Sequence, residues 1–212
     1  MAKPLDALAF RSATADDAAR LAAVLVEGFE TYQAFAPAGW QPPAAEDVAG
    51  LMVPQLAGPT AWCLLAEEDS CVAGYVAFLP AAQSRRPIED PRLAHFWMLF
   101  VRSPWWGSGL AGRLHRCACD AATERRFTEM RLFTPAEQSR ARRFYERERW
   151  RLHGEPHVDE ELGLTIVEYR RELPGRAERS TDGCYVAGDA DRPAGAWDRR
   201  AWVRAKSPDE TA

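Results

Sequence analysis

The sequence predicts a single α+β or α/β domain built on a mixed β-sheet. Three observations lead to this prediction. The β-rich runs 60–68 and 71–80 are separated only by Asp69 and Ser70, which indicates an antiparallel hairpin. The run 94-AHFWMLFV-101 is continuously apolar, as is typical of a central strand buried on both faces. Helix and strand patterns alternate after it, which favours helices packed against the sheet.

The remaining elements follow from periodicity and capping residues. Residues 7–13 form a predicted strand, and Thr14 is a candidate N-cap for an amphipathic helix that ends at about residue 31. A second helix is expected over 45–58, bent or broken by Pro54. The rest of the predicted order is a helix to about residue 124 after a glycine loop, a strand over 128–134, a helix over 136–148, a crossing segment over 149–161 and a last strand over 162–173.

Length and composition support one domain with an appendage. The chain has 212 residues, of which 47% are hydrophobic and 27% charged, an ordinary globular balance. We assign residues 1–173 to the folded domain. Residues 174–212 are rich in Gly, Pro, Asp and Arg without sustained periodicity, and we expect a mostly disordered tail.

Charge and cysteine usage exclude several classes of function. The net charge of −4 does not indicate a nucleic-acid-binding protein, and the basic run Arg140, Arg142 and Arg143 is interpreted as a solvated helix face. The absence of an apolar segment of membrane-spanning length predicts a cytoplasmic protein with no membrane partner. The four histidines are scattered and the five cysteines show no C-x-x-C spacing, so we expect no metal site.

The stretch 106-WGSGLAG-112 contains Gly107, Gly109 and Gly112 at the G-x-G-x-x-G spacing of dinucleotide-binding proteins. That interpretation fails in three ways. Five residues separate the strand from the first glycine, the next strand does not end in an acidic residue, and the loop lies late in the chain. A dinucleotide-binding protein is therefore a weak alternative.

Two stretches instead carry a resemblance to a known family. They are the glycine loop and the later segment 138-QSRARRFYERERW-150. Together they resemble the GNAT superfamily of N-acetyltransferases, whose loop runs (Gln/Arg)-x-x-Gly-x-(Gly/Ala) and whose later helix contains Ala-x-x-Phe/Leu-Tyr-Glu. Gly109 and Ala111 match the loop motif. Trp106 stands where the family usually has Gln or Arg, and Gln138 replaces a usual Asn.

The resemblance implies a mixed, mostly antiparallel sheet flanked by helices, with a splayed central strand pair. It also implies acetyl-CoA as co-substrate, with the pyrophosphate at the glycine loop and helix N-terminus and the pantetheine along the central strand. The implied cofactor-binding residues are Leu99, Phe100, Val101, Trp106, Gly107, Ser108, Gly109, Leu110, Ala111, Gly112 and Gln138.

Acyl transfer to an amine needs a proton donor for the departing thiolate and a route for the proton of the amine. The resemblance implies that Tyr145 is the donor. His95 lies where many family members have a Glu and is our candidate base; the alternatives are a buried, hydrogen-bonded histidine or a wall that shapes the substrate site. A water held by Glu67 or Glu68 is an alternative base.

The resemblance thus predicts direct attack by a primary amine, from a small molecule or a peptide, in a ternary complex. The aromatic residues Tyr32, Phe35, Trp40 and Trp97 are interpreted either as an acceptor wall or as core packing beneath a loop. A non-catalytic acyl-CoA-binding module is the main alternative, and a homodimer is possible.

Overall fold

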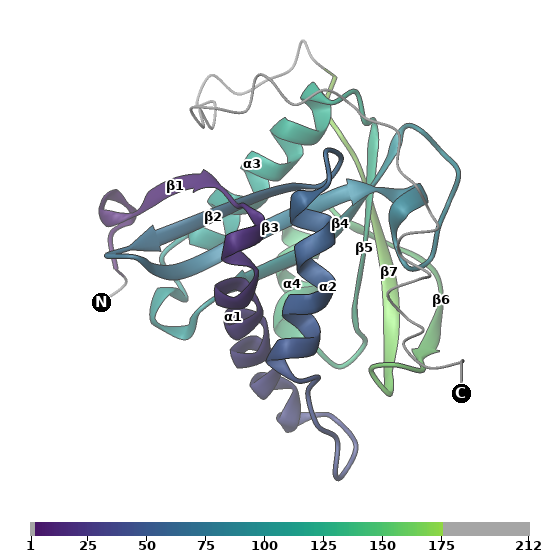
Figure 1. Cartoon of the computed structure of the whole chain (residues 1–212). Helices are drawn as coiled ribbons and strands as arrows, with labels where there is room; N and C mark the ends of the chain where they lie inside the picture. Colours follow the sequence, from purple (N-terminus) through teal and green to yellow (C-terminus); the bar gives the residue numbers. More distant parts are fainter. Residues whose placement is uncertain (1–2, 176–212) are drawn as a thin grey trace, which may run out of the picture.

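The structure, a computed structural model, describes residues 3–175. Its centre is an open seven-stranded sheet in the order β1-β2-β3-β4-β5-β7-β6 (Figure 1). Every neighbouring pair is antiparallel except β4 and β5, which run parallel. The predicted mixed, mostly antiparallel sheet is therefore confirmed. The strands are β1 (Ala9–Ser12), β2 (Trp62–Glu68), β3 (Cys71–Pro80), β4 (Leu93–Val101), β5 (Glu129–Pro135), β6 (Arg151–Asp159) and β7 (Leu164–Glu172).

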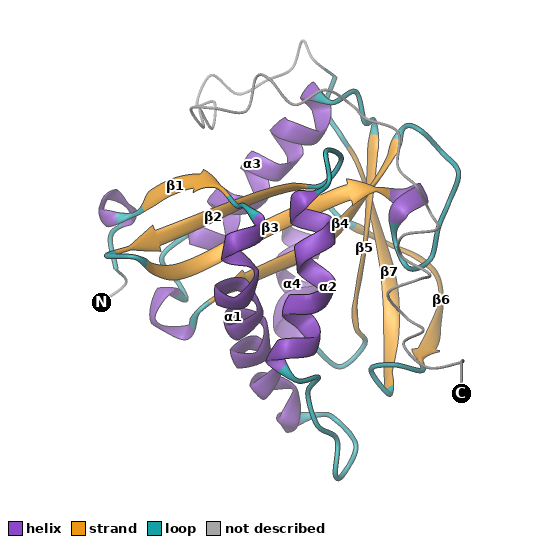
Figure 2. Ribbon diagram, viewed as in Figure 1, coloured by secondary structure: helices purple, strands orange, loops and turns teal. Residues whose placement is uncertain are grey.

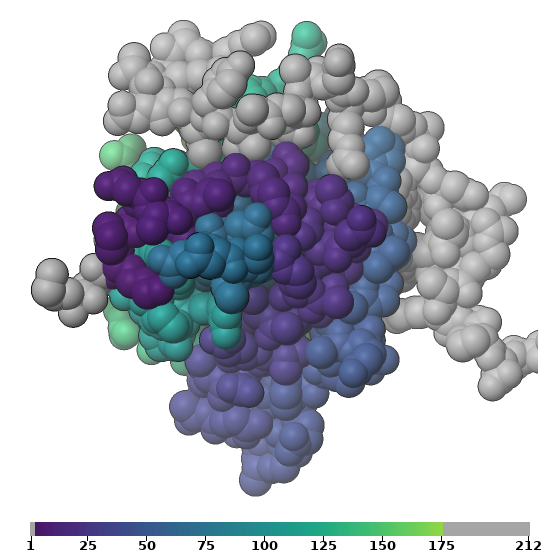
Figure 3. Space-filling view, turned by 60° about the vertical axis from the view of Figure 1, so that its left-hand side comes forward, coloured from purple at the N-terminus to yellow at the C-terminus, as the bar shows by residue number. Residues whose placement is uncertain are grey.

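Four α-helices cover the two faces of this sheet. They are α1 (Ala18–Glu30), α2 (Ala45–Ala57), α3 (Leu110–Glu124) and α4 (Ser139–Arg147). α1 and α2 lie against one face, and α3 and α4 lie against the other (Figure 2). Two buried clusters match these layers, one centred on Leu21, Leu25 and Met52 and the other on Leu110 and Leu114. The connection between α1 and α2 projects beyond the rest of the described chain (Figure 3).

The central parallel pair is short, and this produces a wedge in the sheet. β4 and β5 are in register only where Leu93, Ala94 and His95 face residues 129–131. Beyond that point β4 continues along β3, while β5 stays paired with β7 as far as Pro135. A register shift between β3 and β4 lies just beyond the last β4–β5 pair. Bulges of this kind bend a strand and increase its twist, which helps the two halves of the sheet to separate.

The first helix is fixed to the sheet by an ion-pair network. Arg11 on β1 binds Asp17 at 2.7 Å and Glu67 on β2 at 2.9 Å, and Arg20 on α1 binds both carboxylates. The hydrogen bond from Arg11 is the main cause that lowers the pKa of Asp17 to about 2. Asp17 also forms a capping box with Thr14, the predicted N-cap. Glu67 is therefore occupied in holding α1, which corrects its interpretation as a holder of catalytic water.

One predicted segment was wrong. Residues 149–161 do not merely cross the fold, because β6 pairs with β7 along the edge of the sheet. The first six residues of β6 are all exposed, and its sequence RLHGEPHVD does not alternate between apolar and polar residues. The sequence therefore contains no pattern that predicts a strand here. The second helix is confirmed over Ala45–Ala57, and it continues through Pro54 without a break. The expectation for the tail falls outside the described residues, apart from 174 and 175.

His115 shows how the helix layer behind the sheet depends on a neutral imidazole. Its ring on α3 is 1% exposed, and its Nε2 accepts a hydrogen bond from the Trp150 indole N–H at 2.9 Å. An indole N–H can only donate, so Nε2 carries no proton in this arrangement. Burial, with smaller repulsion from Arg171 and Arg116, lowers the pKa of His115 to about 3.

This shift predicts acid sensitivity. Between its folded pKa of about 3 and its ordinary value of 6.5, His115 takes up a proton more readily in the unfolded chain. Its contribution to stability is therefore complete above pH 6.5 and is lost as the pH falls toward 3, by at most about 1.4 kcal/mol per pH unit. His115→Gln keeps an acceptor for Trp150 without this titration. We expect a shallower fall of the unfolding free energy in acid, measured by urea unfolding at several pH values.

His153→Gln, the same change at an exposed histidine on β6, is the control. It should leave the slope of unfolding free energy against pH as it is in the wild type. Equal slopes for His115→Gln and the wild type would contradict the assignment of a buried neutral ring.

Candidate functional site

A cavity of about 1780 Å³ opens where β4 and β5 separate. It brings together almost all the residues that the sequence singled out. Both candidate catalytic residues, His95 and Tyr145, line it. So do these predicted cofactor residues: Leu99, Phe100, Val101, Trp106, Gly107, Gly109, Leu110, Ala111, Gly112 and Gln138. Ser108 does not line it, because its hydroxyl is used inside the loop, where it donates to Trp105 O and accepts from Leu110 N–H.

One edge of β4 faces this cavity with its backbone. The N–H of Arg102 bonds to Ala73 O on β3. The backbone N–H and C=O groups of successive residues point to opposite edges of a strand. Those of Phe100 therefore also point toward β3, whereas those of Leu99 and Val101 point toward the side from which β5 has separated. The Val101 carbonyl accordingly accepts a hydrogen bond from the Trp106 indole N–H at 2.7 Å instead of from a strand. The wedge thus presents main-chain groups to whatever occupies it.

The glycine loop delivers the N-terminus of α3 to the same cavity. Gly109 is the N-cap, with φ of +89°, and Gly107 has φ of +79°. Both angles lie in the left-handed region that only glycine adopts readily. The first helical hydrogen bond runs from Arg113 N–H to Gly109 O. The N–H groups of Ala111 and Gly112 therefore belong to the first turn, where backbone donors and the helix dipole favour an anion.

Trp106 and Arg140 form a pair across the mouth of this loop. The guanidinium of Arg140, on α4, lies 3.5 Å from the centre of the Trp106 ring. Both residues line the cavity, and the Trp106 side chain is 42% exposed. Arg140 is exposed, as the interpretation of a solvated helix face requires, and it also borders the cavity. Its neighbour Arg142 points elsewhere, toward Tyr169 and the Ala136 carbonyl.

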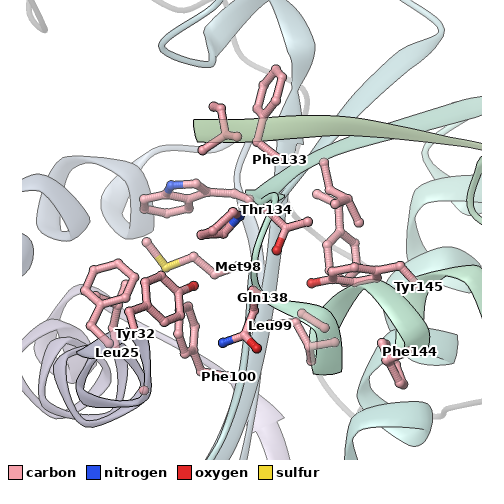
Figure 4. Close-up of a pocket in the computed structure, with 18 of the residues that line it drawn as sticks. Leu25, Tyr32, Met98, Leu99, Phe100, Phe133, Thr134, Gln138, Phe144 and Tyr145 are labelled. Atoms are coloured by element: carbon pink, nitrogen blue, oxygen red, sulfur yellow. The ribbon is translucent and has the colours of Figure 1, made fainter. Parts of the chain in front are cut away.

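Tyr145 reaches the wedge from α4, directly behind the splayed strands. Its ring packs edge-on against Phe96 and Trp150. Figure 4 shows the hydroxyls of Tyr145 and Tyr32 directed into the same gap, with Thr134 and Gln138 beside it. Burial raises the pKa of each phenol well above its ordinary value. Both hydroxyls therefore remain protonated at neutral and moderately basic pH.

His95 lies at the narrow end of the wedge, at the last register position shared by β4 and β5. It is 8% exposed, and within the described chain its Nδ1 has no hydrogen-bond partner. Burial, with a smaller contribution from the Arg131 charge, lowers the pKa of His95 to about 3. The ring is therefore neutral at physiological pH and has little affinity for a proton. Nδ1 is itself enclosed by the protein, although the residue lines the cavity.

The part of the cavity on the side of α1 and α2 is enclosed by aromatic side chains. The ring of Tyr32 stacks on that of Trp40, with 6.1 Å between ring centroids, and packs against Phe35 with 5.1 Å between centroids. Trp40 lies behind Tyr32 and donates its indole N–H to Leu162 O at 2.6 Å, 122 residues away. The sequence suggested these aromatic residues as an acceptor wall or as core packing; Tyr32, Phe35 and Trp97 line the cavity, whereas Trp40 does not. The link from Trp40 to the β6–β7 turn had no sequence signal, because its acceptor is a backbone carbonyl.

The described part of the chain does not point to other kinds of site. Residues 3–175 bring no three His, Cys, Asp or Glu side chains together in a way that suits a metal ion. In the same range no helix has the length and apolar character needed to cross a membrane. Glu68, the other suggested water holder, is paired with Lys3 at 2.7 Å and does not line the cavity.

Comparison with solved structures shows the same fold in several proteins. An acetyltransferase from Thermus thermophilus superposes with a TM-score of 0.57 at 21% identity, over 81% of this chain and 100% of that one. YncA from Salmonella typhimurium, solved with its cofactor acetyl-CoA, gives 0.58 at 18% identity, over 82% and 99%. The PaiA N-acetyltransferase from Thermoplasma acidophilum, in complex with coenzyme A, gives 0.56 at 15% identity, over 76% and 97%.

The sequence comparisons address the family directly. A search of curated proteins found no match. The profile of the acetyltransferase (GNAT) family matches residues 25–149, which is more than half of the chain and includes β4, the glycine loop, α3, β5 and α4. The protein is a member of the GNAT family of acetyltransferases.

Proposed function

We propose that the protein transfers an acetyl group from acetyl-CoA to a primary amine by direct attack within a ternary complex. One observation carries this proposal. The unpaired edge of β4, the N-terminus of α3 and the Tyr145 hydroxyl all meet in one cavity. An anion site, a main-chain edge and a phenolic proton donor are the three features that transfer from a thioester of CoA requires.

The residues of the cavity fit the parts of acetyl-CoA. The first-turn amides of α3 would hold the pyrophosphate, and Leu99 and Val101 would pair with the pantetheine amides as a neighbouring strand would. Trp106 replaces the Gln or Arg that is usual at this position of the loop in the family. Arg140 would supply a cation in its place, since its guanidinium already lies over the indole at the mouth of the loop.

The acid–base roles follow from the two buried groups. Tyr145 would hold a proton for the departing sulfur, because burial keeps its hydroxyl protonated. His95 is too weak a base to take a proton from an ammonium group, whose pKa is about 10.4 in water. We propose that it instead forms part of the wall that shapes the acceptor site beside the reacting amine. Desolvation in the cavity would favour that neutral amine.

Substitution of Arg140 tests the cofactor site. Arg140→Met keeps a long side chain over Trp106 but removes the charge. We expect acetyl-CoA to bind roughly three- to tenfold more weakly at low salt, with a smaller difference at high salt, as screening requires. Calorimetric titration measures this. Arg151→Met, at an exposed arginine of β6 outside the cavity lining, controls for net charge and should bind normally.

S-Acetylpantetheine, which lacks the pyrophosphate, should bind the wild type and Arg140→Met equally. An equal loss of affinity for both ligands would contradict a role of Arg140 at the phosphates.

Substitution of Tyr145 tests catalysis and separates the enzyme from a module that only binds acyl-CoA. Tyr145→Phe keeps the packed ring and removes the proton donor. We expect kcat to fall by about 10²-fold or more, with little change in the KM for acetyl-CoA. Tyr169→Phe is the control, because that hydroxyl bonds to Glu146 and Arg142 outside the cavity.

Turnover is followed as thiol release in the presence of an amine. Unchanged turnover in Tyr145→Phe would remove this residue as the acid. Tight binding of acetyl-CoA without turnover of any amine by the wild type would favour the binding module.

A further inference from the structure

We infer that the acceptor is a small primary amine carried on a compact apolar body, preferably aromatic, rather than a polyamine or the lysine side chain of a protein. This inference rests on the proposed function and specifies its acceptor. It is drawn from the half of the cavity that lies between α1, β4 and β5, which we call the acceptor chamber.

The first argument is the lining of the acceptor chamber. β4 is a central strand with helices on both faces, and such a strand is normally fully buried. Its residues from Trp97 to Val101 are nevertheless only partly buried, because they border the cavity. The chamber therefore exposes apolar surface that a ligand would cover. Its principal apolar side chains are Leu25, Phe29, Tyr32, Trp97, Met98 and Phe133.

The second argument is that the aromatic side chains of this wall already pack against one another. Measured between ring centroids, Phe29 lies 5.0 Å from Tyr32 and 5.8 Å from Phe100. Phe100 in turn stacks on Tyr75 at 6.0 Å. Gly28 permits this arrangement, because a Cβ there would lie 2.4 Å from the Phe100 ring. A preformed aromatic surface binds an apolar ligand without an ordering cost, and ring-on-ring contacts add to the area term.

The third argument concerns charge. A polyamine or a lysine-like chain carries extra cations or polar groups that need partners inside the site. The carboxylates that line the cavity on this side lie at its rim or are already engaged. Asp47 and Glu160 are exposed, Glu161 is paired with Arg85 at 2.5 Å, and Asp159 accepts the amide N–H groups of residues 161 and 162. Deep in the chamber the polar side chains, among them Thr134, Tyr32 and the neutral ring of His95, carry no charge.

The fourth argument concerns access. The connection between α1 and α2 is joined to the β6–β7 turn by the hydrogen bond from Trp40 to Leu162. Trp40 itself is not part of the lining, but Leu162 and Tyr32, which it holds, both are. This link ties together two segments that border the acceptor chamber. A small molecule fits inside such a boundary more readily than a side chain on a folded protein.

The test compares three amines at saturating acetyl-CoA: 2-phenylethylamine, spermidine and an N-acetylated peptide with one lysine. Thiol release gives the rate, and mass spectrometry identifies the product. We expect kcat/KM for phenylethylamine to exceed the other two by at least about tenfold, the scale on which apolar pockets discriminate. A higher value for spermidine or the peptide would overturn the inference while leaving the proposed function intact. No product from any amine would overturn both.

Two variants locate the preference in the chamber. Met98→Gln, a similar shape with polar atoms, should lower kcat/KM for phenylethylamine by about tenfold and reduce its lead over spermidine. Leu152→Gln makes the same kind of change on the exposed face of β6, outside the cavity, and should leave both values unchanged.

Trp40→Phe keeps the stack on Tyr32 and removes the donor to Leu162. It should narrow the discrimination against the peptide. The assignment of the chamber would be contradicted if neither ratio of kcat/KM changed, that is, phenylethylamine over spermidine in Met98→Gln and phenylethylamine over the peptide in Trp40→Phe. Both variants must unfold like the wild type for this comparison.

Discussion

The brief pairing of β4 with β5 is the constraint on which the site depends. Three residue pairs join the two strands. Beyond His95, β4 is paired only with β3 and β5 only with β7. Backbone N–H and C=O groups need partners, so the edge of β4 that β5 abandons is available to a ligand. The glycine loop and α3 follow β4 in the chain, and α4 follows β5. The same separation therefore brings the N-terminus of α3 and Tyr145 to the two sides of one gap.

The chemistry of the gap is set more by desolvation than by charge. Burial keeps the phenols of Tyr145 and Tyr32 protonated and the imidazole of His95 neutral. An apolar surround also lowers the pKa of an amine that enters it, because the charged form loses hydration. The account therefore needs no strong base. A neutral amine is favoured by the same side chains that would select an apolar acceptor, so recognition and activation have a common origin.

The features that the sequence could predict are those with a local signal. The hairpin, the apolar central strand, the glycine loop and the position of Tyr145 each rest on periodicity, turn residues or a motif. β6 was missed because its polar edge sequence has no period. The contacts of Arg140 with Trp106 and of Trp40 with Leu162 were missed because they join distant segments through a ring face and a carbonyl. The partial burial of β4 beyond Phe96 depends on the separation of strands, which no single segment encodes.

Residue-resolved amide hydrogen exchange, with and without acetyl-CoA, tests the central claim that the ligand pairs with the open edge of β4. The account predicts increased protection at Leu99 and Val101, whose backbone faces the wedge, and at Ala111 and Gly112 in the first turn of α3. Phe100, which faces β3, serves as the internal reference and should change less. Binding of acetyl-CoA with unchanged exchange at Leu99, Val101 and the α3 N-terminus would contradict the account.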